Sequence, residues 1–575
     1  MTWLFSSLLL TGGLVSVLAL TPDSFTAFKA QAGFHTNAAL GLSGLSSHGV
    51  VGSDCPQTPA LHPSKHCELN DRLNRLYDSE RFKLHTYETL GDAIRIRTEI
   101  YDDIGPVGGD DRWKVFDEFH EFLEDRFEIL YSELSVTKVD EYGLVIHWQG
   151  SDDSLPPILL AAHQDVVPVD VDTVDEWKER PFSGHYDGTW IWGRGSCDDK
   201  GPLIALMTVM EELLEAGFTP RRTIVLASGF DEEIGGKMGA LQISQYLQNE
   251  YGQDAFALVV DEGSGFLNME SEGDNVIIAL PGTAEKGRTD IRVEVSTPGG
   301  HSSFPPQHTS IGILSSAVVA IESTKHTPKL LRDGTPFATY QCIAEHVPNV
   351  PDSFRRLVEK AKEDDEALCQ LKQTLLEELY PVQNSALLGT TQAVTLIGGG
   401  IKVNALPESA SAIVSNRIGQ HSSVIEVREH FTKILRPVAA DFNLTLEAFG
   451  VEVTTGSSGH LSIGTAFNNA FEPSPKTPTD SSNPYRIFSG TIRAVLEGSK
   501  IHPSKDVVVS PMLVLVNTDT RHYWNLTKHI FRYSHFSQED VHGFHTVNES
   551  VRAEAVIEHI RFLTTLILNW DEATV

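Results

Sequence analysis

The sequence predicts an α/β protein in which a mainly parallel sheet domain is interrupted by a smaller α+β domain. Continuous apolar runs at residues 158–162, 223–227 and 256–260 are typical of strands covered on both faces. Between the first two runs, apolar residues within 203–214 recur with helical spacing and form one stripe. Near residue 289 the apolar pattern changes to a period of two, which indicates a sheet with one face in water.

The chain begins with an uncharged apolar segment, and residues 1–20 are predicted to be a signal peptide or a membrane anchor. The segment is short for a membrane span. Val17 and Ala19 fit the small-residue pattern that precedes a signal-peptidase cut, so a cleaved signal is favoured. Residues 21–84 are rich in Ser, Gly, His and Pro, and are interpreted as a leader or N-terminal extension that is processed or loosely packed.

The regular pattern from residue 85 onward defines the two predicted domains. Residues 85–288 are assigned to the first part of the parallel-sheet domain, and residues 456–575 to its second part. Residues 289–455 are assigned to the inserted α+β domain, in which helical patterns flank a charged helical insertion at about 352–379. In open parallel sheets the functional residues gather in loops at the carboxyl ends of the strands.

The composition is acidic, with 78 Asp and Glu residues against 45 Lys and Arg, and a formal net charge of −33. A surface of this sign repels phosphate, so nucleic acid and anionic lipid are excluded as partners. The acidity suits a mildly acidic compartment, although it equally serves solubility alone.

Five cysteines make an odd count. Cys55 and Cys67 flank a short Pro-rich loop and are predicted to form a disulfide in an oxidising compartment. Three cysteines are predicted to be buried, free thiols: Cys197, Cys342 and Cys369. Three N-x-Ser/Thr sequons fit passage through the secretory pathway: Asn443, Asn525 and Asn548.

Five polar segments carry the candidate chemistry, and the first is His163-Gln164-Asp165 after an apolar run. On a strand end, positions two apart face the same way. A carboxylate beside a histidine orients the imidazole and raises its basicity, as a metal site requires. A hydrogen-bonded pair in the core is the alternative interpretation of this segment.

The second and third segments each offer adjacent carboxylates in a glycine-containing turn. Asp198 and Asp199 follow Gly193-Arg194-Gly195, and an alternative role for them is to begin a helix, where the macrodipole favours acidic residues. In Asp231-Glu232-Glu233 two neighbouring carboxylates cannot easily point the same way, so one can hold a metal while the other serves as a base. A solvated acidic loop is the alternative here.

The last two segments complete a metal-ligand set. Asp261 ends a buried strand, and His542, His545 and Glu549 lie close together near the C-terminus. The five segments jointly supply two neutral nitrogen ligands and three or four carboxylates. That set is able to hold two divalent ions about 3.5–4 Å apart.

The order H-x-D, G-R-G-x-x-D-D-K-G, D-E-E-x-G, D-E-G and H-x-x-N-E resembles the aminoacylase and carboxypeptidase family of di-zinc metallopeptidases. The segments T-P-G-G-H-S-S and N-T-D-T-R-H-Y-W-N-L most resemble the fungal vacuolar carboxypeptidase S type, or Gly-X carboxypeptidase. The resemblance covers roughly residues 85–575. It implies a di-zinc catalytic domain and a ferredoxin-like lid or dimerisation domain, with two Zn²⁺ per chain.

The resemblance also implies a role for each motif residue. Asp198 bridges both zinc ions, and its peptide bond to Asp199 is expected to be cis. Asp165 orients His163, Glu232 is the general base, and His301 of the lid stabilises the oxyanion. The ligands implied for the first zinc are His163 and Asp261, and those for the second are Glu233 and His545. His542 competes for the last role, but His545 fits the family spacing.

Recognition of a free substrate carboxylate favours arginine, whose planar guanidinium binds it bidentately. Arg417 and Arg521 are the candidates, with Asn404 as a possible lid contact, and a surface salt bridge is the alternative for either arginine. The sequence departs from the family at Cys197, expected to be a small packed side chain, and at Asn517, where relatives often carry glycine.

The implied function is a zinc-dependent carboxypeptidase that hydrolyses the C-terminal bond of short peptides through a hydroxide held between two zinc ions. An alternative on the same site is an N-acyl-amino-acid hydrolase or synthase, and a second alternative is an inactive binding homologue. The expected setting is the secretory pathway, with the protein in the vacuole lumen, at the vacuolar membrane or secreted. The resemblance leaves open a homodimer formed through the lid.

Overall fold

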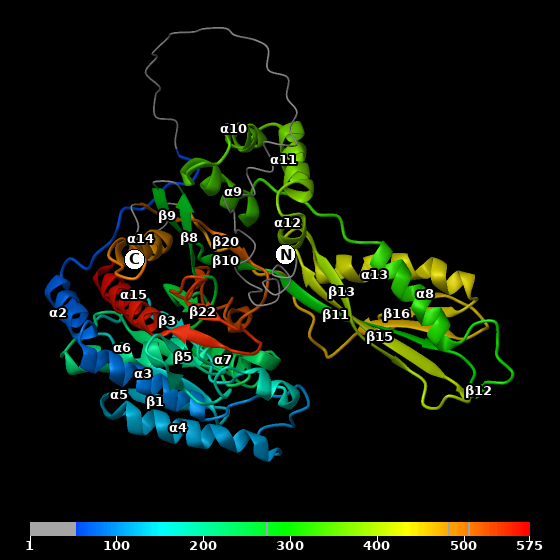
Figure 1. Cartoon of the computed structure of the whole chain (residues 1–575), viewed down its shortest axis with the longest axis horizontal. Helices are drawn as coiled ribbons and strands as arrows, with labels where there is room; N and C mark the ends of the chain where they lie inside the picture. Colours follow the sequence, from blue (N-terminus) through cyan, green and yellow to red (C-terminus); the bar gives the residue numbers. More distant parts are fainter. Residues whose placement is uncertain (1–52, 272–273, 481–482, 504–505, 575) are drawn as a thin grey trace, which may run out of the picture.

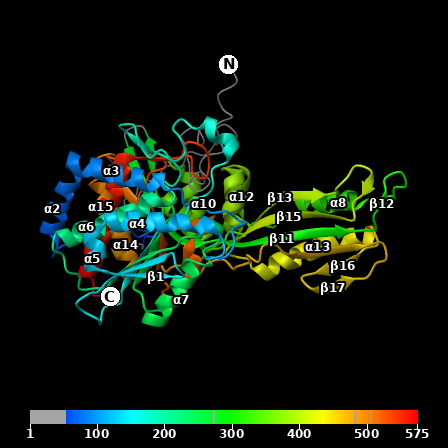
Figure 2. The ribbon, with the colours of Figure 1, turned by 90° about the horizontal axis from the view of Figure 1, so that it is seen from below.

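The computed structural model describes residues 53–271, 274–480, 483–503 and 506–574. A large α/β body carries an elongated second domain, which extends away from it and contains β11, β13, β15, α8 and α13 (Figures 1 and 2). The predicted signal peptide at 1–20 and leader residues 21–52 lie outside the described residues. Among the helices that are described, none is long and apolar enough to cross a membrane.

The main domain is built on an eight-stranded sheet of order β1-β2-β6-β3-β7-β21-β10-β20. The central pairs β6–β3, β3–β7 and β7–β21 are parallel, while β1–β2, β2–β6 and β10–β21 are antiparallel. The predicted mainly parallel sheet is therefore confirmed. The strands span β1 (Ser135–Val139), β2 (Gly143–Trp148), β3 (Ile158–Ala161), β6 (Ile224–Ser228), β7 (Leu258–Asp261), β10 (Gly282–Glu285), β20 (Met512–Val514) and β21 (Ile530–Arg532).

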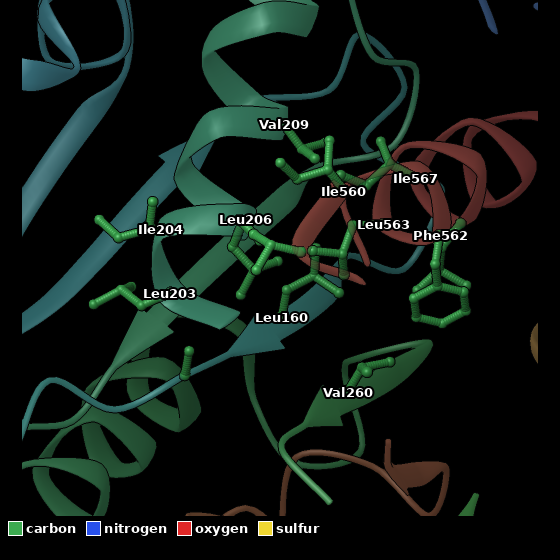
Figure 3. Packing of buried hydrophobic residues seen from close by; sticks show 14 of the residues in the cluster. Leu160, Leu203, Ile204, Leu206, Val209, Val260, Ile560, Phe562, Leu563 and Ile567 are labelled. Atoms are coloured by element: carbon green, nitrogen blue, oxygen red, sulfur yellow. The ribbon is translucent and has the colours of Figure 1, made fainter. Parts of the chain in front are cut away.

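Both faces of the central strands are buried, which explains their unbroken apolar sequences. Leu160 and Val260 belong to the core on the face covered by α6 (Lys200–Glu215) and α15 (Ala553–Glu572), as Figure 3 shows. Their neighbours Leu159 and Val259 belong to the core on the opposite face, with α7 (Ala240–Tyr251). Successive strand residues thus pack against different helices, as the pleat of a strand requires.

The described part of the predicted leader is an integral part of the main domain. Helix α2 (Cys67–Tyr77) and helix α3 (Glu80–Arg95) both contribute to the main core, and α2 buries Leu73 and Tyr77 there. The Tyr77 hydroxyl lies 2.9 Å from Thr564 Oγ1 of α15. Residues 53–84 are therefore neither loosely packed nor separate. The few apolar residues of α2 lie on one helical face. They are separated by polar and charged residues, so the periodicity was too weak to predict the helix.

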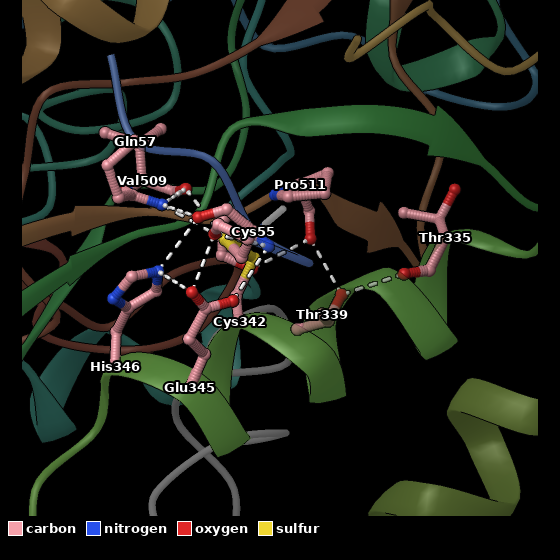
Figure 4. Close-up of a disulfide and its surroundings, with 11 residues drawn as sticks. Cys55, Gln57, Thr335, Thr339, Cys342, Glu345, His346, Val509 and Pro511 are labelled. Carbon is pink, nitrogen blue, oxygen red and sulfur yellow. Dashed lines mark hydrogen bonds and ion pairs between the residues drawn. A yellow bond between two sulfur atoms is a disulfide. The ribbon is translucent and has the colours of Figure 1, made fainter. Parts of the chain in front are cut away.

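The disulfide joins Cys55 to Cys342, so the predicted Cys55–Cys67 pairing is wrong. An extended segment at 53–61 runs past helix α9 (Thr335–His346), and Figure 4 shows Cys55 against Cys342 of that helix. Cys55 N donates to Glu345 Oε2 at 3.0 Å, and Gln57 pairs with Val509, so hydrogen bonds hold the segment beside the helix. Cys197 is a buried thiol as predicted, whereas Cys67 and Cys369 are exposed thiols.

The inserted domain is a six-stranded sheet of order β13-β15-β11-β18-β16-β17, covered on one face by two helices. Its elements are β11 (Gly287–Ser296), α8 (Ser310–Ser323), β13 (Thr391–Gly399), β15 (Ser409–Ile418), α13 (Val424–Asp441), β16 (Thr445–Ala448), β17 (Val451–Thr454) and β18 (His460–Thr465). The inserted α+β domain is confirmed. Because β18 pairs with β11, the sheet continues to Thr465, ten residues beyond the predicted boundary at 455.

The helices between β11 and β13 do not all belong to the inserted domain. Four helices pack into a separate apolar cluster that includes β9 (Asp274–Ala279) and β20 of the main domain. They are α9, α10 (Asp352–Ala361), α11 (Asp365–Glu377) and α12 (Pro381–Leu388). The charged insertion predicted inside the 289–455 domain therefore packs on the main domain.

Candidate functional site

The five polar segments meet at one edge of the main sheet. His163 and Asp165 follow β3, Glu232 and Glu233 follow β6 in a short 3₁₀ turn, and Asp261 ends β7. These three strands are adjacent and parallel, so their carboxyl ends lie side by side. Asp198 precedes α6, and His545 comes from the loop between β22 (Val541–His542) and β23 (Ser550–Arg552).

Asp198 lies between the two candidate histidine ligands. Its Oδ1 is 3.0 Å from His163 Nε2, and its Oδ2 is 2.6 Å from His545 Nε2. Burial opposes ionisation of this carboxyl, but hydrogen bonds from the two imidazoles hold the pKa of Asp198 well below its usual range. The predicted cis peptide bond between Asp198 and Asp199 is present. One carboxylate thus offers a separate oxygen to each side of the cluster.

Asp165 holds three parts of the site at once. Its Oδ1 accepts a hydrogen bond from Glu232 N at 3.1 Å, and its Oδ2 accepts one from Glu233 N at 3.0 Å. The imidazole Nδ1 of His163 lies 2.9 Å from the Asp165 carbonyl oxygen and 3.3 Å from Oδ1. The His163 Nε2 is therefore the nitrogen that faces the cluster.

Two overlapping groups of side chains have the spacing of metal ligands. The ligand atoms in each group lie within 4.8 Å of one another: His163, Asp198 and Glu233 in one, and His163, Glu232 and Glu262 in the other. Asp261 is buried, and its Oδ2 has no hydrogen-bond partner in the described part of the chain. Such an oxygen is costly to bury unless a cation or a proton satisfies it.

The charges of the cluster also fit bound cations. Burial, opposed in part by the His163 imidazole, raises the pKa of Glu232 to about 8 and that of Asp261 to about 6. Burial and the nearby Asp198 raise the pKa of Glu262 well above its ordinary value. Burial and mutual repulsion therefore disfavour the ionised form of these carboxyls, and bound divalent ions would stabilise that form. Imidazole and carboxylate together form a donor set that suits zinc.

Glu262 and Asp199 were part of the predicted motifs but received no ligand or catalytic role, and both lie beside the cluster. Glu262 Oε1 lies 3.8 Å from His163 Nε2, and Asp199 Oδ2 accepts a hydrogen bond from His163 N at 3.0 Å. Each directly follows a predicted ligand, Asp198 or Asp261, in an acidic pair. The acidic pairs themselves were therefore the available signal.

Glu549 fastens the loop that carries Asp198 to the loop that carries His545. Its carboxylate forms a buried ion pair with Arg194 and accepts hydrogen bonds from Gly195 N at 2.9 Å and Cys197 N at 3.2 Å. Burial, Glu549 and Asp198 raise the pKa of the Cys197 thiol well above its usual value. Cys197 is therefore a neutral, packed side chain.

The structure distinguishes His545 from His542. His545 Nε2 lies 2.6 Å from Asp198 Oδ2 and 3.4 Å from Glu233 Oε1. The His542 ring instead lies 4.4 Å from the ring of Trp190, between centroids. Among the described residues His542 forms no ion pair with a carboxylate of the cluster, so the geometry favours His545 as the ligand.

The cluster opens into a cavity of about 520 Å³ between the main domain and the base of the lid. One part of its wall is cationic, with Arg288, Arg417 and Arg521, and includes Asn517. Another part is apolar, with Val516, Phe536, Val541 and Phe544. An elongated ligand with an anionic end and an apolar part would match this distribution.

The three arginines differ in their partners. Arg288 pairs with Asp290 at 2.9 Å, and Arg521 Nη2 lies 3.8 Å from Glu232 Oε1. Arg417 Nη1 donates to Asn517 Oδ1 at 2.8 Å, and within the described ranges it has no carboxylate at ion-pair distance. Of these three arginines, Arg417 is therefore the one with no carboxylate of the described chain at ion-pair distance.

His301 and Asn404 are not brought to the cluster. His301 lies in β12 (Gly300–His301), which pairs with β14 (Ala405–Leu406), and Ser302 N donates to the Asn404 carbonyl oxygen at 3.1 Å. Both side chains are exposed, and neither lines the cavity. Figure 1 shows β12 at the far end of the lid from the main domain.

Residues 159–569 match the family described as peptidase family M20/M25/M40. The chain is 36% identical to Carboxypeptidase S of Saccharomyces cerevisiae over 528 residues, which cover 90% of this chain and 89% of that protein. It is 32% identical to the N-fatty-acyl-amino acid synthase/hydrolase PM20D1 of Mus musculus, covering 86% of this chain and 89% of that protein. The fold is similar to human carnosine dipeptidase 1, with a TM-score of 0.59 at 16% identity over 88% of this chain and 99% of that chain.

Proposed function

The chain belongs to peptidase family M20/M25/M40, and on that premise we propose that it is a zinc-dependent carboxypeptidase that hydrolyses the C-terminal bond of short peptides of the Gly-X type. The observation that carries the proposal is the position of Asp198 between His163 and His545, in the wall of a cavity that Arg417 also lines. The name of the yeast relative supports the choice of a carboxypeptidase.

Two zinc ions are proposed to occupy the carboxylate and histidine cluster. His163 and Asp261 would hold one ion, Glu233 and His545 the other, and Asp198 would contact both. Glu262 is close enough to His163 to add a carboxylate oxygen on the first side. When bound, such ions supply Lewis-acid polarisation and lower the pKa of a bound water towards about 7.

Glu232 is proposed as the general base. Its backbone N–H is fixed by Asp165, and its carboxylate lines the cavity beside the cluster. The two cations proposed beside Glu232 would favour its ionised form, which is the form that accepts a proton. Glu232 would take the proton of the attacking water and pass it to the leaving amine. Its presence argues against the alternative of an inactive homologue.

Arg417 is proposed to bind the free carboxylate of the substrate. A guanidinium binds a carboxylate with two parallel hydrogen bonds, and this one has no carboxylate of the described chain to satisfy it. Arg521 faces Glu232 at 3.8 Å and is proposed instead to orient the base. Between the two arginines that the sequence suggested, the contacts favour Arg417 as the anchor.

His301 and Asn404 are proposed to reach a cavity through a second copy of the chain or through movement of the lid. Their exposure at the far end of the lid supports this idea. The outer strand β13 leaves Leu396 and Ile397 exposed, at 57% and 62%, on an edge that a second lid could cover. We therefore propose a homodimer through the lid, in which each copy completes the other's site.

The protein is proposed to act in the secretory pathway, in the vacuole or outside the cell. The Cys55–Cys342 disulfide fits an oxidising compartment. Asn443 and Asn525 have exposed side chains, but Asn443 Nδ2 donates to Ser457 Oγ at 2.9 Å, and the Asn548 side chain accepts a hydrogen bond from Lys178 N at 2.5 Å. Asn525 is therefore the sequon best placed to carry a glycan.

A second candidate function is hydrolysis or synthesis of N-acyl amino acids on the same site. The apolar wall formed by Val516, Phe536, Val541 and Phe544 favours it, because an acyl chain could pack there. The similarity to a synthase/hydrolase of N-fatty-acyl amino acids supports the same idea. The two functions would share the proposed metals and base, and would differ in what the apolar wall holds.

The test is the release of free amino acid by purified protein, with and without a chelator. The substrates are an N-acyl-Gly-Leu peptide and N-oleoyl amino acids. Chelator-sensitive release from the peptide is the expected result, and release from the oleoyl substrates alone would replace the proposal by the second candidate. If a protein that binds two metals per chain released amino acid from neither substrate, the proposed substrate class would be refuted.

The assignment of the base is tested with Glu232→Gln. We expect turnover to be lost while bound metal is retained, because the amide can no longer accept the proton. Glu250→Gln, an exposed residue of α7, is the matched control and should behave as wild type. Normal turnover in Glu232→Gln would refute the assignment.

A further inference from the structure

Asn517 lies at the junction between the main domain and the lid. It belongs to the segment between β20 and the short 3₁₀ helix at Asp519–His522, and it lines the cavity. Its carboxamide contacts one residue where the chain enters the lid and one residue of the lid sheet. One is Lys286, the residue between β10 of the main sheet and β11 of the lid sheet, and the other is Arg417 of β15.

The two contacts fix the orientation of the carboxamide. Arg417 Nη1 donates to Asn517 Oδ1 at 2.8 Å, and Asn517 Nδ2 donates to the Lys286 carbonyl oxygen. A guanidinium only donates hydrogen bonds and a carbonyl oxygen only accepts them. A flipped amide would therefore lose both bonds, and the Asn517 oxygen must face Arg417.

Arg417 is held in a cationic corner of the cavity. It is half-buried, and in β15 it stands opposite Arg288 of β11. Burial and the nearby Arg288 and Arg521, opposed by the more distant charges of Asp290 and Glu232, lower the pKa of Arg417 to about 10, so the group remains charged at neutral pH. An anionic group of the substrate would stabilise the Arg417 guanidinium most if no carboxylate of the protein were already paired with it.

The neutral partner of Arg417 contrasts with the partners of its neighbours. Arg288 has the carboxylate of Asp290 at 2.9 Å, and Arg521 has that of Glu232 at 3.8 Å. Only an uncharged amide oxygen fixes the direction of Arg417 among the described side chains. A hydrogen bond from an amide orients a guanidinium without cancelling its charge.

We propose that Asn517 is a positioning residue that aims Arg417 into the cavity with its charge unpaired, and thereby sets the selection of substrates with a free terminal carboxylate. The inference rests on the proposed function, because it takes Arg417 as the carboxylate anchor. It adds a specificity role for a side chain outside the metal cluster.

The test replaces Asn517 by Asp, which keeps the shape and supplies the protein's own carboxylate to Arg417. Initial rates are measured with N-acyl-Gly-Leu, and the corresponding Leu-amide is included as a second substrate or as a competing inhibitor. For the acid, we expect KM to rise about 10- to 100-fold, the loss of a charge-assisted hydrogen bond. We expect kcat to change by less than about threefold, because the metals and the base are untouched.

Three comparisons make the result specific. The affinity for the amide should not change in Asn517→Asp, because the amide carries no charge for Arg417 to bind. Asn249→Asp adds the same negative charge at an exposed position of α7 and should leave both substrates unaffected. In an Arg417→Met background, Asn517→Asp should add no further loss, because Asn517 acts through Arg417.

The outcomes separate this inference from the proposed function. A wild-type protein that binds the acid and the amide equally well would overturn the carboxylate anchor and, with it, the role of Asn517. A wild-type protein that prefers the acid, with Asn517→Asp retaining that preference, would overturn only the role of Asn517. An equal loss for acid and amide would also overturn it, because the substitution would then act on the fold of the cavity.

Discussion

Asp165 offers the sharpest test of how the candidate site is held together. Its carboxylate is fully buried, accepts hydrogen bonds from Glu232 N and Glu233 N, and lies 3.3 Å from His163 Nδ1. Replacement by Asn keeps the shape of the side chain but turns one acceptor into a donor. The new N–H group must then face an N–H of the site.

The magnitude follows from the bonds that are lost. A hydrogen bond to a charged group contributes about 1.5–3 kcal/mol, and an unpaired buried donor costs about 1–3 kcal/mol. Asp165→Asn loses one such bond and leaves one N–H of Glu232 or Glu233 unpaired, so the folded protein loses about 2.5–6 kcal/mol of stability in total. Groups that orient a metal ligand affect metal affinity or activity by about 10- to 100-fold. We expect a decrease of that size in both.

The assay is a titration of metal-free protein with zinc against a chromogenic chelator, followed by kcat/KM at saturating metal. Asp175→Asn is the matched control, because Asp175 is exposed in the 3₁₀ turn Val171–Glu176 and does not line the cavity. Unchanged zinc affinity together with unchanged kcat/KM in a folded Asp165→Asn protein would refute the reasoning. A loss confined to thermal stability would show that Asp165 supports the fold and not the metal site.

Two further predictions concern stability. Burial, with Glu215 and Glu211 nearby, raises the pKa of Glu212 from 4.5 to about 7, so this carboxyl contributes stability at low pH that is lost as the pH rises towards 7. Glu212→Gln should therefore raise the unfolding midpoint at about pH 7.5 and leave it nearly unchanged at about pH 4.5, and equal shifts at both would contradict the assignment. Peptide mapping without reductant should recover Cys55 linked to Cys342, with Cys67 and Cys369 open to alkylation. Cys342→Ser should lower the unfolding midpoint, with about 6 kcal/mol as the chain-entropy bound for a sequence separation of 287, and a peptide linking Cys55 to Cys67 would refute the pairing.

Local patterns in the sequence were sufficient to predict the main sheet and the candidate cluster. The strands that end at His163 and Asp261 are buried on both faces, so their sequences are continuously apolar and end at the polar edge. Adjacent parallel strands bring their carboxyl ends together. The proximity of His163, Asp198 and Glu233 therefore follows from topology once the strands are recognised.

Features that depend on packing between distant segments were not predictable in the same way. Cys55 has a nearer candidate in Cys67, and only the course of residues 53–61 past α9 brings it to Cys342. The amphipathic pattern of α10 and α11 is the same whichever domain receives their apolar faces. The distance of His301 from the cavity depends on how far the lid extends, which no local pattern records.

The position of β21 has a consequence for the order in which this chain folds during synthesis. This strand, Ile530–Arg532, lies between β7 and β10 in the main sheet, although some 250 residues separate it from either neighbour in the chain. The sheet therefore has a gap at its centre until the ribosome has passed residue 532. The lid strands, which end at Thr465, are complete earlier. Until β21 is synthesised, β7 and β10 have unpaired edges. Such a state favours slow folding and dependence on chaperones.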